Sequence, residues 1–360
     1  MSSILRKKDT YLYSKAIIHA LKKNMSRVKD IPDIRFITGF NTLSENELPD
    51  VFVDMLSKEA AEIKKSRLCA FDTRADSVKP ERLRKWKNLF GENTGVNIGV
   101  ESSNEWLRNH WIGKKIRNGS LKNAVDIIKS EDMLSSMSIL LGIPGLSELQ
   151  SIAVFLDSLD FVISLNPDRI VLSPTMCQKY TLQNYIKDNF RTEEHVFRGL
   201  NDINSSRWVI SIYSVYVSCR IAVKLYPHFS DKIMLNPEFF YSYFFEDHYL
   251  EYAEEDEKDI MRKIMKLLNE CIRCGNFNSL YDENSEIINN PVFVRYFQNL
   301  NMQDSPSEIK KTILFTGQTL INKMDFSAKT NLYIKLKNEI KNFSYIPKYS
   351  WDDIDRLLNK

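Results

Sequence analysis

The chain has 360 residues, of which 43% are hydrophobic and 27% charged, and its formal net charge is +3. This composition is typical of a globular protein with a proper core, and the nearly balanced charge excludes binding to polyanions through overall charge. The longest apolar stretch, residues 208–217, is shorter than the roughly 20 residues of a membrane span, so we expect a buried helix and no membrane association. The five scattered cysteines favour a reducing cytoplasm over a disulfide framework.

The N-terminal half alternates short apolar runs, which end in Gly, Ser, Glu or Pro, with segments of helical length. This alternation is typical of βα units, in which functional residues gather on the loops after the strands. The pattern predicts strands over residues 34–38, 67–72, 96–100, 137–141 and 169–172, and helices over 11–29, 49–65, 80–90, 104–111, 121–129 and 147–165.

Successive strands begin one βα unit apart, which predicts an α/β fold with a partial TIM-like (β/α) barrel of about five parallel strands. We expect this barrel to occupy residues 1–190 and a mainly helical domain to occupy residues 191–360. The second half predicts helices over 202–226, 254–274, 307–323 and 328–343, with loops around 276–290, at Pro291 and over 301–307.

Five segments at the predicted strand ends carry a resemblance to a known family. They read FITGFNTLSENELP, FDTRAD, IGVESSNEWLR, LLGIPGLSE and IVLSPTMCQKYT. In this order and at βα spacing they resemble the radical S-adenosylmethionine (SAM) barrel, and within that superfamily the archaeosine-synthesis and Elongator- or MiaB-like branch. The resemblance covers residues 33–185 and implies a barrel that binds SAM across its strand ends.

The resemblance implies roles for residues after the first two predicted strands. The loop at Thr38 and Gly39, with Glu47 further along, would approach the methionine end of SAM, and Arg74 would lie beside the substrate or the cofactor. A glycine permits this close approach because it has no side chain.

Residues after the next two strands complete the implied site. Glu101 and Ser102 would contact the ribose or the amino group of SAM, since a carboxylate accepts hydrogen bonds from hydroxyl and ammonium groups. Gly142 and Ile143 would present their backbone to the adenine. The resemblance assigns no catalytic residue and no metal ligand in this sequence.

The family's CxxxCxxC motif, which holds a [4Fe–4S] cluster, does not occur in these 360 residues. We therefore expect the first strand and the cluster loop of the family barrel to be missing. SAM is a possible cofactor, whereas a cluster is expected only if a missing segment or a separate cluster-bearing polypeptide supplies it.

Two further patterns have competing interpretations. The CxxC of Cys271 and Cys274 is half of a metal site or, as favoured here, two reduced cysteines at a helix end. Aromatic residues alternate with a basic cluster, which suits stacking on nucleic acid but is favoured as a solvated helix face with its tryptophans in the core. The residues concerned are Arg74, Arg108, Lys114, Lys115, Arg117, Trp106, His110 and Trp111.

Three functional hypotheses follow. The first is a truncated, split or degenerate radical SAM-related protein, whose family chemistry would be reductive SAM cleavage to modify a tRNA base or another substrate. The second is a non-catalytic, cluster-less barrel that binds RNA or a protein partner. The third is an unrelated TIM-like enzyme that uses Glu101 and Arg74 as an acid/base pair, unless Glu101 instead caps the next helix or pairs with Arg74.

Overall fold

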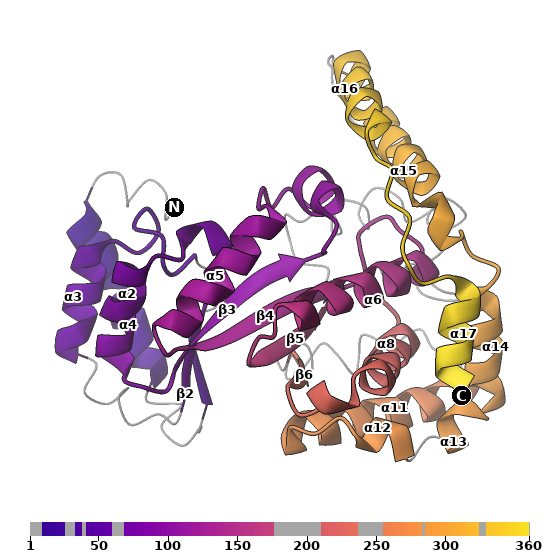
Figure 1. The fold of residues 1–360 in the computed structure, drawn as a ribbon, viewed down its shortest axis with the longest axis horizontal. Coiled ribbons are helices and arrows are strands. Elements are labelled where there is room, and N and C mark those ends of the chain that lie inside the picture. The colour runs from indigo at the N-terminus through magenta and orange to yellow at the C-terminus, as the bar shows by residue number, and fades with distance from the viewer. Residues whose placement is uncertain are drawn as a thin grey trace. The chain divides into compact units, whose positions relative to one another are not determined.

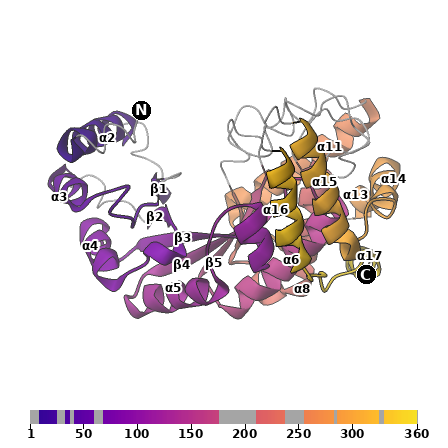
Figure 2. The same cartoon turned by 90° about the horizontal axis from the view of Figure 1, so that it is seen from above.

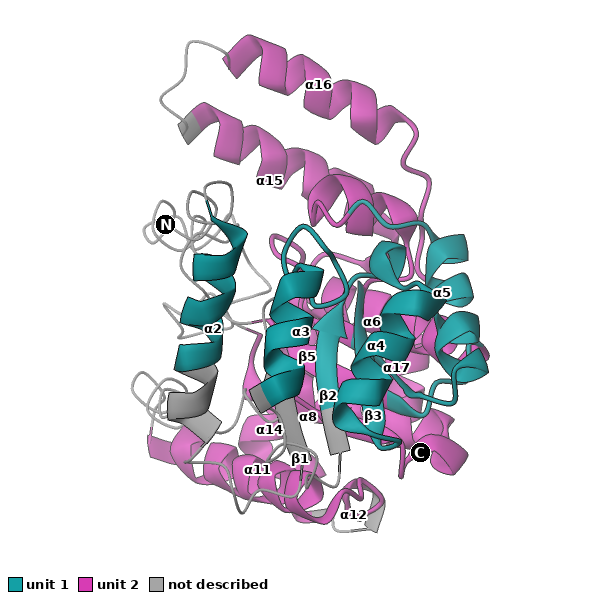
Figure 3. Cartoon of the chain, turned by 90° about the vertical axis from the view of Figure 1, so that its left-hand side faces the viewer, with its two compact units in different colours: residues 1–100, 115–138, 165–169 teal, residues 101–114, 139–164, 170–360 magenta. Residues whose placement is uncertain are grey.

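The structure of the chain is a computed structural model that describes residues 9–25, 33–37, 41–59, 68–175, 210–236, 255–282, 285–323 and 329–359. The chain forms two compact units, coloured separately in Figure 3. Unit 1 comprises residues 1–100, 115–138 and 165–169, and unit 2 comprises residues 101–114, 139–164 and 170–360. The expected domain boundary at residue 190 lies outside the described residues and stays a prediction.

The described strands form a six-stranded sheet in the order β1-β2-β3-β4-β5-β6 (Figure 1). The five strands predicted from sequence are all present, with ends within three residues of the expected ones. A sixth strand of three residues, not predicted from the sequence, follows in the half that was expected to be mainly helical. The strands are β1 (Asp33–Ile37), β2 (Leu68–Thr73), β3 (Thr94–Glu101), β4 (Leu134–Leu141), β5 (Arg169–Pro174) and β6 (Ile233–Leu235).

The strand order and direction define the fold class. The pairs β1–β2, β2–β3 and β5–β6 are parallel, with Asp72 opposite Asn97 and Ile170 opposite Ile233. Each strand neighbours the next one in sequence without a reversal of order, which distinguishes a barrel from a doubly wound sheet. The described part of the chain is therefore an α/β protein with a partial (β/α) barrel, followed by helices.

Helices of unit 1 follow their strands as the periodicity predicts. Helix α4 begins at a proline, which suits the first helical turn, and ends before Gly91, which adopts a φ of 92°. Its Trp86 is fully buried between Phe71 and Phe90, at ring-centroid distances of 5.1 and 5.5 Å. The described helices of this unit are α2 (Thr10–Met25), α3 (Asp50–Glu59), α4 (Pro80–Phe90) and α5 (Asn118–Ser130).

Unit 2 contains a central helix, α8 (Ile212–Leu225), which is buried along nearly its whole length. Helices α6 (Glu148–Ser164), α11 (Glu255–Cys274) and α17 (Trp351–Asn359) pack against it. A helix buried on every side is mostly apolar all round, and α8 contains residues 212–217 of the apolar stretch that the sequence predicts to be a buried helix. Within the described residues, no helix is both long and apolar enough to span a bilayer.

Two loop predictions in unit 2 were wrong. The stretch expected as a loop around residue 280 contains the short helices α12 (Ser279–Asp282) and α13 (Ser285–Ile288). Pro291 begins helix α14 (Pro291–Leu300), because Asn290 caps it by accepting a hydrogen bond from the Val292 amide at 2.9 Å.

Two helices of unit 2 pack against each other, and Figure 2 shows them side by side. These are α15 (Ile309–Lys323) and α16 (Lys329–Lys341), both predicted from sequence. Their close contact depends on Gly317, where a Cβ atom would lie 2.6 Å from the Leu336 side chain. A separate π-helical turn, η3 (Leu107–Trp111), replaces the ordinary helix expected there.

Candidate functional site: a polar network in the partial barrel

The loop after β1 is joined to the end of β2 by the side chain of Asn41. The Asn41 Oδ1 atom accepts hydrogen bonds from the Thr73 hydroxyl at 2.8 Å and from the Arg74 amide at 3.0 Å. Its Nδ2 atom donates to the Ser77 hydroxyl at 2.7 Å. One short side chain thus fixes two loops of unit 1 at the strand ends, where ligands bind in barrels of this type.

A buried arginine fixes the remainder of the same loop. The Arg82 side chain, from α4, is 2% exposed and donates to the carbonyl oxygens of Leu43 at 3.2 Å and Leu48 at 2.8 Å. It also forms an ion pair with Asp50, the first residue of α3. A buried guanidinium requires such partners, so this set of bonds makes the loop a rigid part of unit 1.

Polar side chains continue across β2, β3 and β4. The Asn97 Nδ2 atom donates to Asp72 Oδ1 at 2.8 Å, and its Oδ1 atom accepts from the hydroxyls of Ser136 and Ser138, each at 3.0 Å. Asn97 and Ser138 are 7% and 9% exposed. Among the described residues, nothing donates to the second carboxylate oxygen of Asp72, which leaves an acceptor available. We call Asp72, Asn97, Ser136 and Ser138, which these bonds join, the polar network.

The opposite face of these strands is apolar. Val96, Ile98 and Val100 are fully buried and alternate with Asn97 along β3, and Met137 alternates with the serines of β4 in the same way. Strands of a parallel sheet are usually apolar on both faces. The polar side chains of β3 and β4 therefore share one face of the sheet, with Asp72 of β2 joined to them.

The residues predicted from sequence in unit 1 are not brought together around one space by the described contacts. Thr38 and Gly39 lie outside the described residues. Glu47 closes its own loop, because its Oε2 atom accepts the Asn41 amide at 2.9 Å. The Arg74 guanidinium makes two hydrogen bonds to Asp76, at 3.0 and 2.9 Å.

Glu101 is the last residue of β3 and Ser102 follows it, and both belong to unit 2. The Glu101 carboxylate pairs with Lys114 at 2.5 Å, which differs from the pairing with Arg74 that the sequence left open. The backbone of Glu101 has a φ of 63°, which lies in the left-handed region, a conformation that costs a non-glycine residue about 1–2 kcal/mol. The buried Ser102 hydroxyl accepts the Asn104 amide at 3.2 Å, and Asn104 in turn accepts the Leu107 amide at 2.9 Å at the start of the helical segment.

Gly142 and Ile143 follow β4 and are both buried. A Cβ atom on Gly142, whose φ is 90°, would lie 3.1 Å from the Thr175 hydroxyl and 3.2 Å from the Ile210 Cβ atom. The Ile143 amide donates to the Ser151 hydroxyl at 3.1 Å, and its side chain belongs to the core of unit 2. The described contacts give both residues packing roles, and their contact with adenine stays a prediction.

The described residues do not fit an iron–sulfur cluster. They contain no group of three or more His, Cys, Asp or Glu side chains that could hold a metal ion. Cys271 is buried and lies 3.1 Å from the Ser279 hydroxyl, while Cys274 is exposed, as expected for reduced cysteines at a helix end. Burial raises the pKa of the Cys271 thiol, which disfavours the thiolate that metals bind.

The predicted basic cluster is divided by the fold. Arg108 is fully buried, and burial lowers the pKa of its guanidinium. Trp111 donates its indole N–H to the Pro144 carbonyl at 2.7 Å, while Trp106 stacks on His110 at a centroid distance of 5.5 Å. The tryptophans are partly buried against the core of unit 2, as the favoured interpretation expected, whereas the buried Arg108 is not part of a solvated face.

Sequence reasoning missed Asn41, Asp72, Asn97 and the two serines of β4. The candidates proposed from the sequence lie at or after the ends of the predicted strands. Asp72, Asn97 and the two serines lie within strands, and Asn41 is recognised only by its hydrogen-bond partners. The alternation of small or polar residues with Val and Ile along β3 was the available signal.

Comparisons with known proteins give distant similarities. No family model matches the chain. An uncharacterized protein of Methanocaldococcus jannaschii is 22% identical over 177 residues, which is 48% of this chain and 48% of that protein. The chain thus spans about half the length of the curated relative it matches.

Two solved structures are similar at 15% and 14% identity. One is the archaeal Elp3 of Methanocaldococcus infernus with an N-terminal deletion. The similarity covers 65% of this chain and 53% of the Elp3 chain, with a TM-score of 0.41. The other is the radical SAM methyltransferase TsrM of Kitasatospora setae with cobalamin and a [4Fe–4S] cluster bound, which covers 72% and 55%, with a TM-score of 0.41.

Proposed function

We propose that this chain is a radical SAM-related protein whose partial barrel binds a polar small molecule, with SAM as the ligand, at the polar network. The observation that carries the proposal is the polar face formed by Asp72, Asn97 and the serines of β4. The five strand-end segments that resemble the radical SAM barrel support the choice of ligand.

The polar network has the donors and acceptors that SAM requires. The available carboxylate oxygen of Asp72 accepts hydrogen bonds from an ammonium group or from ribose hydroxyls. The serine hydroxyls both donate and accept, so they adapt to the hydroxyls of a ribose. The loop fixed by Asn41 and Arg82 provides a rigid boundary, which reduces the entropy lost on binding.

Calorimetric titration with SAM and with S-adenosylhomocysteine tests the proposal. We expect Asp72→Asn to weaken binding about 10- to 100-fold, because a hydrogen bond to a charged group contributes about 1.5–3 kcal/mol. Asp126→Asn is the matched control, since Asp126 is an exposed residue of α5 in the same unit. Failure of the wild-type chain to bind either ligand would remove SAM from the proposal, and equal binding by Asp72→Asn would move the site elsewhere.

The same titration tests the role implied for Glu101. Glu101→Ala removes the carboxylate together with its ion pair to Lys114. We expect it to weaken SAM binding if the resemblance assigns its role correctly. Unchanged affinity would leave Glu101 as a structural ion pair.

The chemistry implied by the resemblance, reductive SAM cleavage for modification of a tRNA base or another substrate, needs a cluster that the described residues do not fit. We therefore derive no catalytic step for this chain and propose a separate cluster-bearing polypeptide as its partner. Co-expression with such a polypeptide, followed by co-purification and iron analysis, tests the partnership. Separate elution of the two chains would count against it.

A second function is a non-catalytic barrel that binds RNA or a protein partner. The ion pairs Glu101–Lys114 and Arg74–Asp76 count against the third hypothesis, the acid/base enzyme, because both of its proposed residues already have charged partners. Loss of SAM binding in the titration, combined with retention of a macromolecular partner, would select this function.

A further inference from the structure

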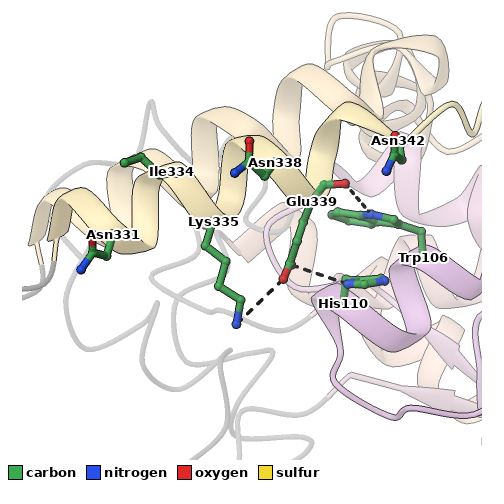
Figure 4. Close-up of a pocket in the computed structure, with 8 residues that line it drawn as sticks. All are labelled: Trp106, His110, Asn331, Ile334, Lys335, Asn338, Glu339 and Asn342. Carbon is green, nitrogen blue, oxygen red and sulfur yellow. Dashed lines mark hydrogen bonds and ion pairs between the residues drawn. The ribbon is translucent and has the colours of Figure 1, made fainter.

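An open groove lies between α16 and the π-helical turn η3, within unit 2 (Figure 4). Its volume is about 490 Å³, and its lining combines aromatic, amide and charged side chains. Trp106 and His110 come from or directly precede η3, whereas Asn331, Lys335 and Asn338 come from α16. None of these residues belongs to the polar network of the barrel.

The aromatic side of the groove is fixed in position. The Trp106 indole donates to the Glu339 carbonyl at 3.1 Å, and its ring meets Phe343 edge-on at a centroid distance of 4.7 Å. His110 stacks on Trp106 with an interplanar angle of 24°. The His110 side chain remains 47% exposed, so this supported ring offers a surface on which another planar group can stack.

The helical side of the groove presents unused hydrogen-bonding groups. Asn331, Asn338 and Asn342 are exposed, and their amides form no hydrogen bond with other described residues. Lys335 and Asn338 lie 4 and 7 residues after Asn331, which places the three on one face of α16, and Asn342 directly follows the end of that helix. The face therefore forms a row of amide donors and acceptors with a cation among them (Figure 4).

The groove lining carries one lysine and one glutamate, Lys335 and Glu339, and the helices around it are basic. The sequences of α15 and α16 contain seven lysines and one glutamate. Lys335 is 72% exposed and lies 3.9 Å from the Glu339 carboxylate, a separation at which an exposed pair contributes little. Lys335 is thus available to a phosphate of a ligand in the groove.

We propose that this groove binds single-stranded nucleic acid. A base stacks on the exposed face of His110, the asparagine amides contact base edges, and Lys335 contacts a phosphate. An acidic peptide would satisfy the lysines but would use neither the stacked ring nor the row of amides. The proposal goes beyond the SAM-binding barrel, because it assigns a second site to residues of α16 and η3.

Fluorescence anisotropy tests this proposal with labelled oligouridylate RNA and oligothymidylate DNA of about twelve nucleotides, a length within the site sizes of single-strand binders. We expect His110→Ala to weaken binding about five- to tenfold, as for the loss of one stacked base. We expect Lys335→Ala to reduce the slope of log K against log salt by about 0.7, the value for one phosphate contact on a single strand.

His228→Ala and Lys266→Ala are the matched controls, because both residues are exposed in unit 2 and neither lines the groove. They should bind as the wild type does. Circular dichroism of each variant verifies folding, and the milder Asn338→Ala provides an independent test of the groove. A preference for the RNA over the DNA oligomer would identify contacts to the 2′-hydroxyl, whereas equal binding would identify general single-strand binding.

Three results would overturn the proposal. The first is no binding of either oligomer at about 50 mM salt, where phosphate contacts are strong. The second is binding that His110→Ala, Lys335→Ala and Asn338→Ala all leave unchanged. The third is His110-dependent binding of a polyglutamate peptide without binding of the oligomers, which would make the groove a site for acidic peptides.

Discussion

The buried carboxylate of Glu148 provides a sharp test of the packing in unit 2. Glu148 is fully buried in the first turn of α6. It accepts hydrogen bonds from the Ser211 amide at 2.8 Å, the Ser214 hydroxyl at 2.9 Å and the Tyr296 hydroxyl at 2.7 Å. Since Ser211 caps α8, the carboxylate lies at the N-terminal ends of two helices, where negative charge is stabilised.

The perturbation is Tyr296→Phe, which removes one donor to this carboxylate. The ring keeps its packing, because it lies 4.7 Å from the Tyr213 ring and 6.2 Å from the Phe293 ring, and both contacts are available to phenylalanine. Loss of a hydrogen bond to a buried charged group costs about 1.5–3 kcal/mol. We expect the free energy of unfolding to fall by that amount.

Comparison with Glu148→Gln isolates the interaction. The glutamine amide group would be a hydrogen-bond donor facing Ser211 and Tyr296, which are themselves donors. We therefore expect the free energy of unfolding of this variant to fall by about 1–3 kcal/mol. Combining it with Tyr296→Phe should cost less than the sum of the single changes. The double-mutant cycle should give a coupling of about 0.5–3 kcal/mol, the range for residues in one hydrogen-bonded network.

The pH dependence has a definite sign. Burial raises the pKa of Glu148 above its ordinary value of 4.5. Between 4.5 and the higher pKa of the folded state, the folded chain retains a proton that the unfolded chain has lost. The contribution of this residue to stability is therefore fully present below pH 4.5 and falls as pH rises through that window. Glu148→Gln removes the ionisable carboxyl group and with it this pH dependence of stability.

Urea titrations followed by far-UV circular dichroism, at acidic and neutral pH, measure both effects. Tyr11→Phe is the control, since Tyr11 is 54% exposed and its change should lie within about 0.5 kcal/mol of the wild type. A Tyr296→Phe variant within that same margin would refute the role of the hydrogen bond. An unchanged pH dependence in Glu148→Gln would refute the titration argument.

Three further predictions concern the sheet and the cysteines. Gly142→Ala should lower the free energy of unfolding by about 1–2 kcal/mol in urea titrations, because the φ of Gly142 is positive and an added Cβ would meet Thr175. The control Gly119→Ala should not, because the space around Gly119 is open, and equal effects of the two changes would contradict this. Asn97→Ala should cost about 1–3 kcal/mol in the same titration, since it leaves buried polar groups without a partner, and a neutral effect would show that water replaces it. Anaerobic reconstitution followed by iron counting should find no stoichiometric cluster in the wild type or in Cys271→Ser. About four irons per wild-type chain that are lost in Cys271→Ser would contradict the interpretation of Cys271 and Cys274 as reduced cysteines.

The sequence by itself determined the five βα strands and the helices between them. Local periodicity carries this information, because a strand such as β3 alternates with period two and a helix such as α4 begins at a proline and ends at a glycine. It also predicted a buried helix for the apolar stretch over residues 208–217, which is too short for a membrane span, and residues 212–217 lie in the buried helix α8.

Tertiary structure decided which polar residues act together. Asn97 is connected to Ser138, which lies 41 positions later, and Glu148 to Tyr296, which lies 148 positions later. Such bonds leave no local pattern, because the fold alone brings their donors and acceptors within reach. The sequence analysis proposed Glu101 and Arg74 as site residues because a sequence does not show ion pairs, and the structure pairs their charges with Lys114 and Asp76. Local propensity specifies elements, whereas a buried polar group needs a partner that only packing supplies.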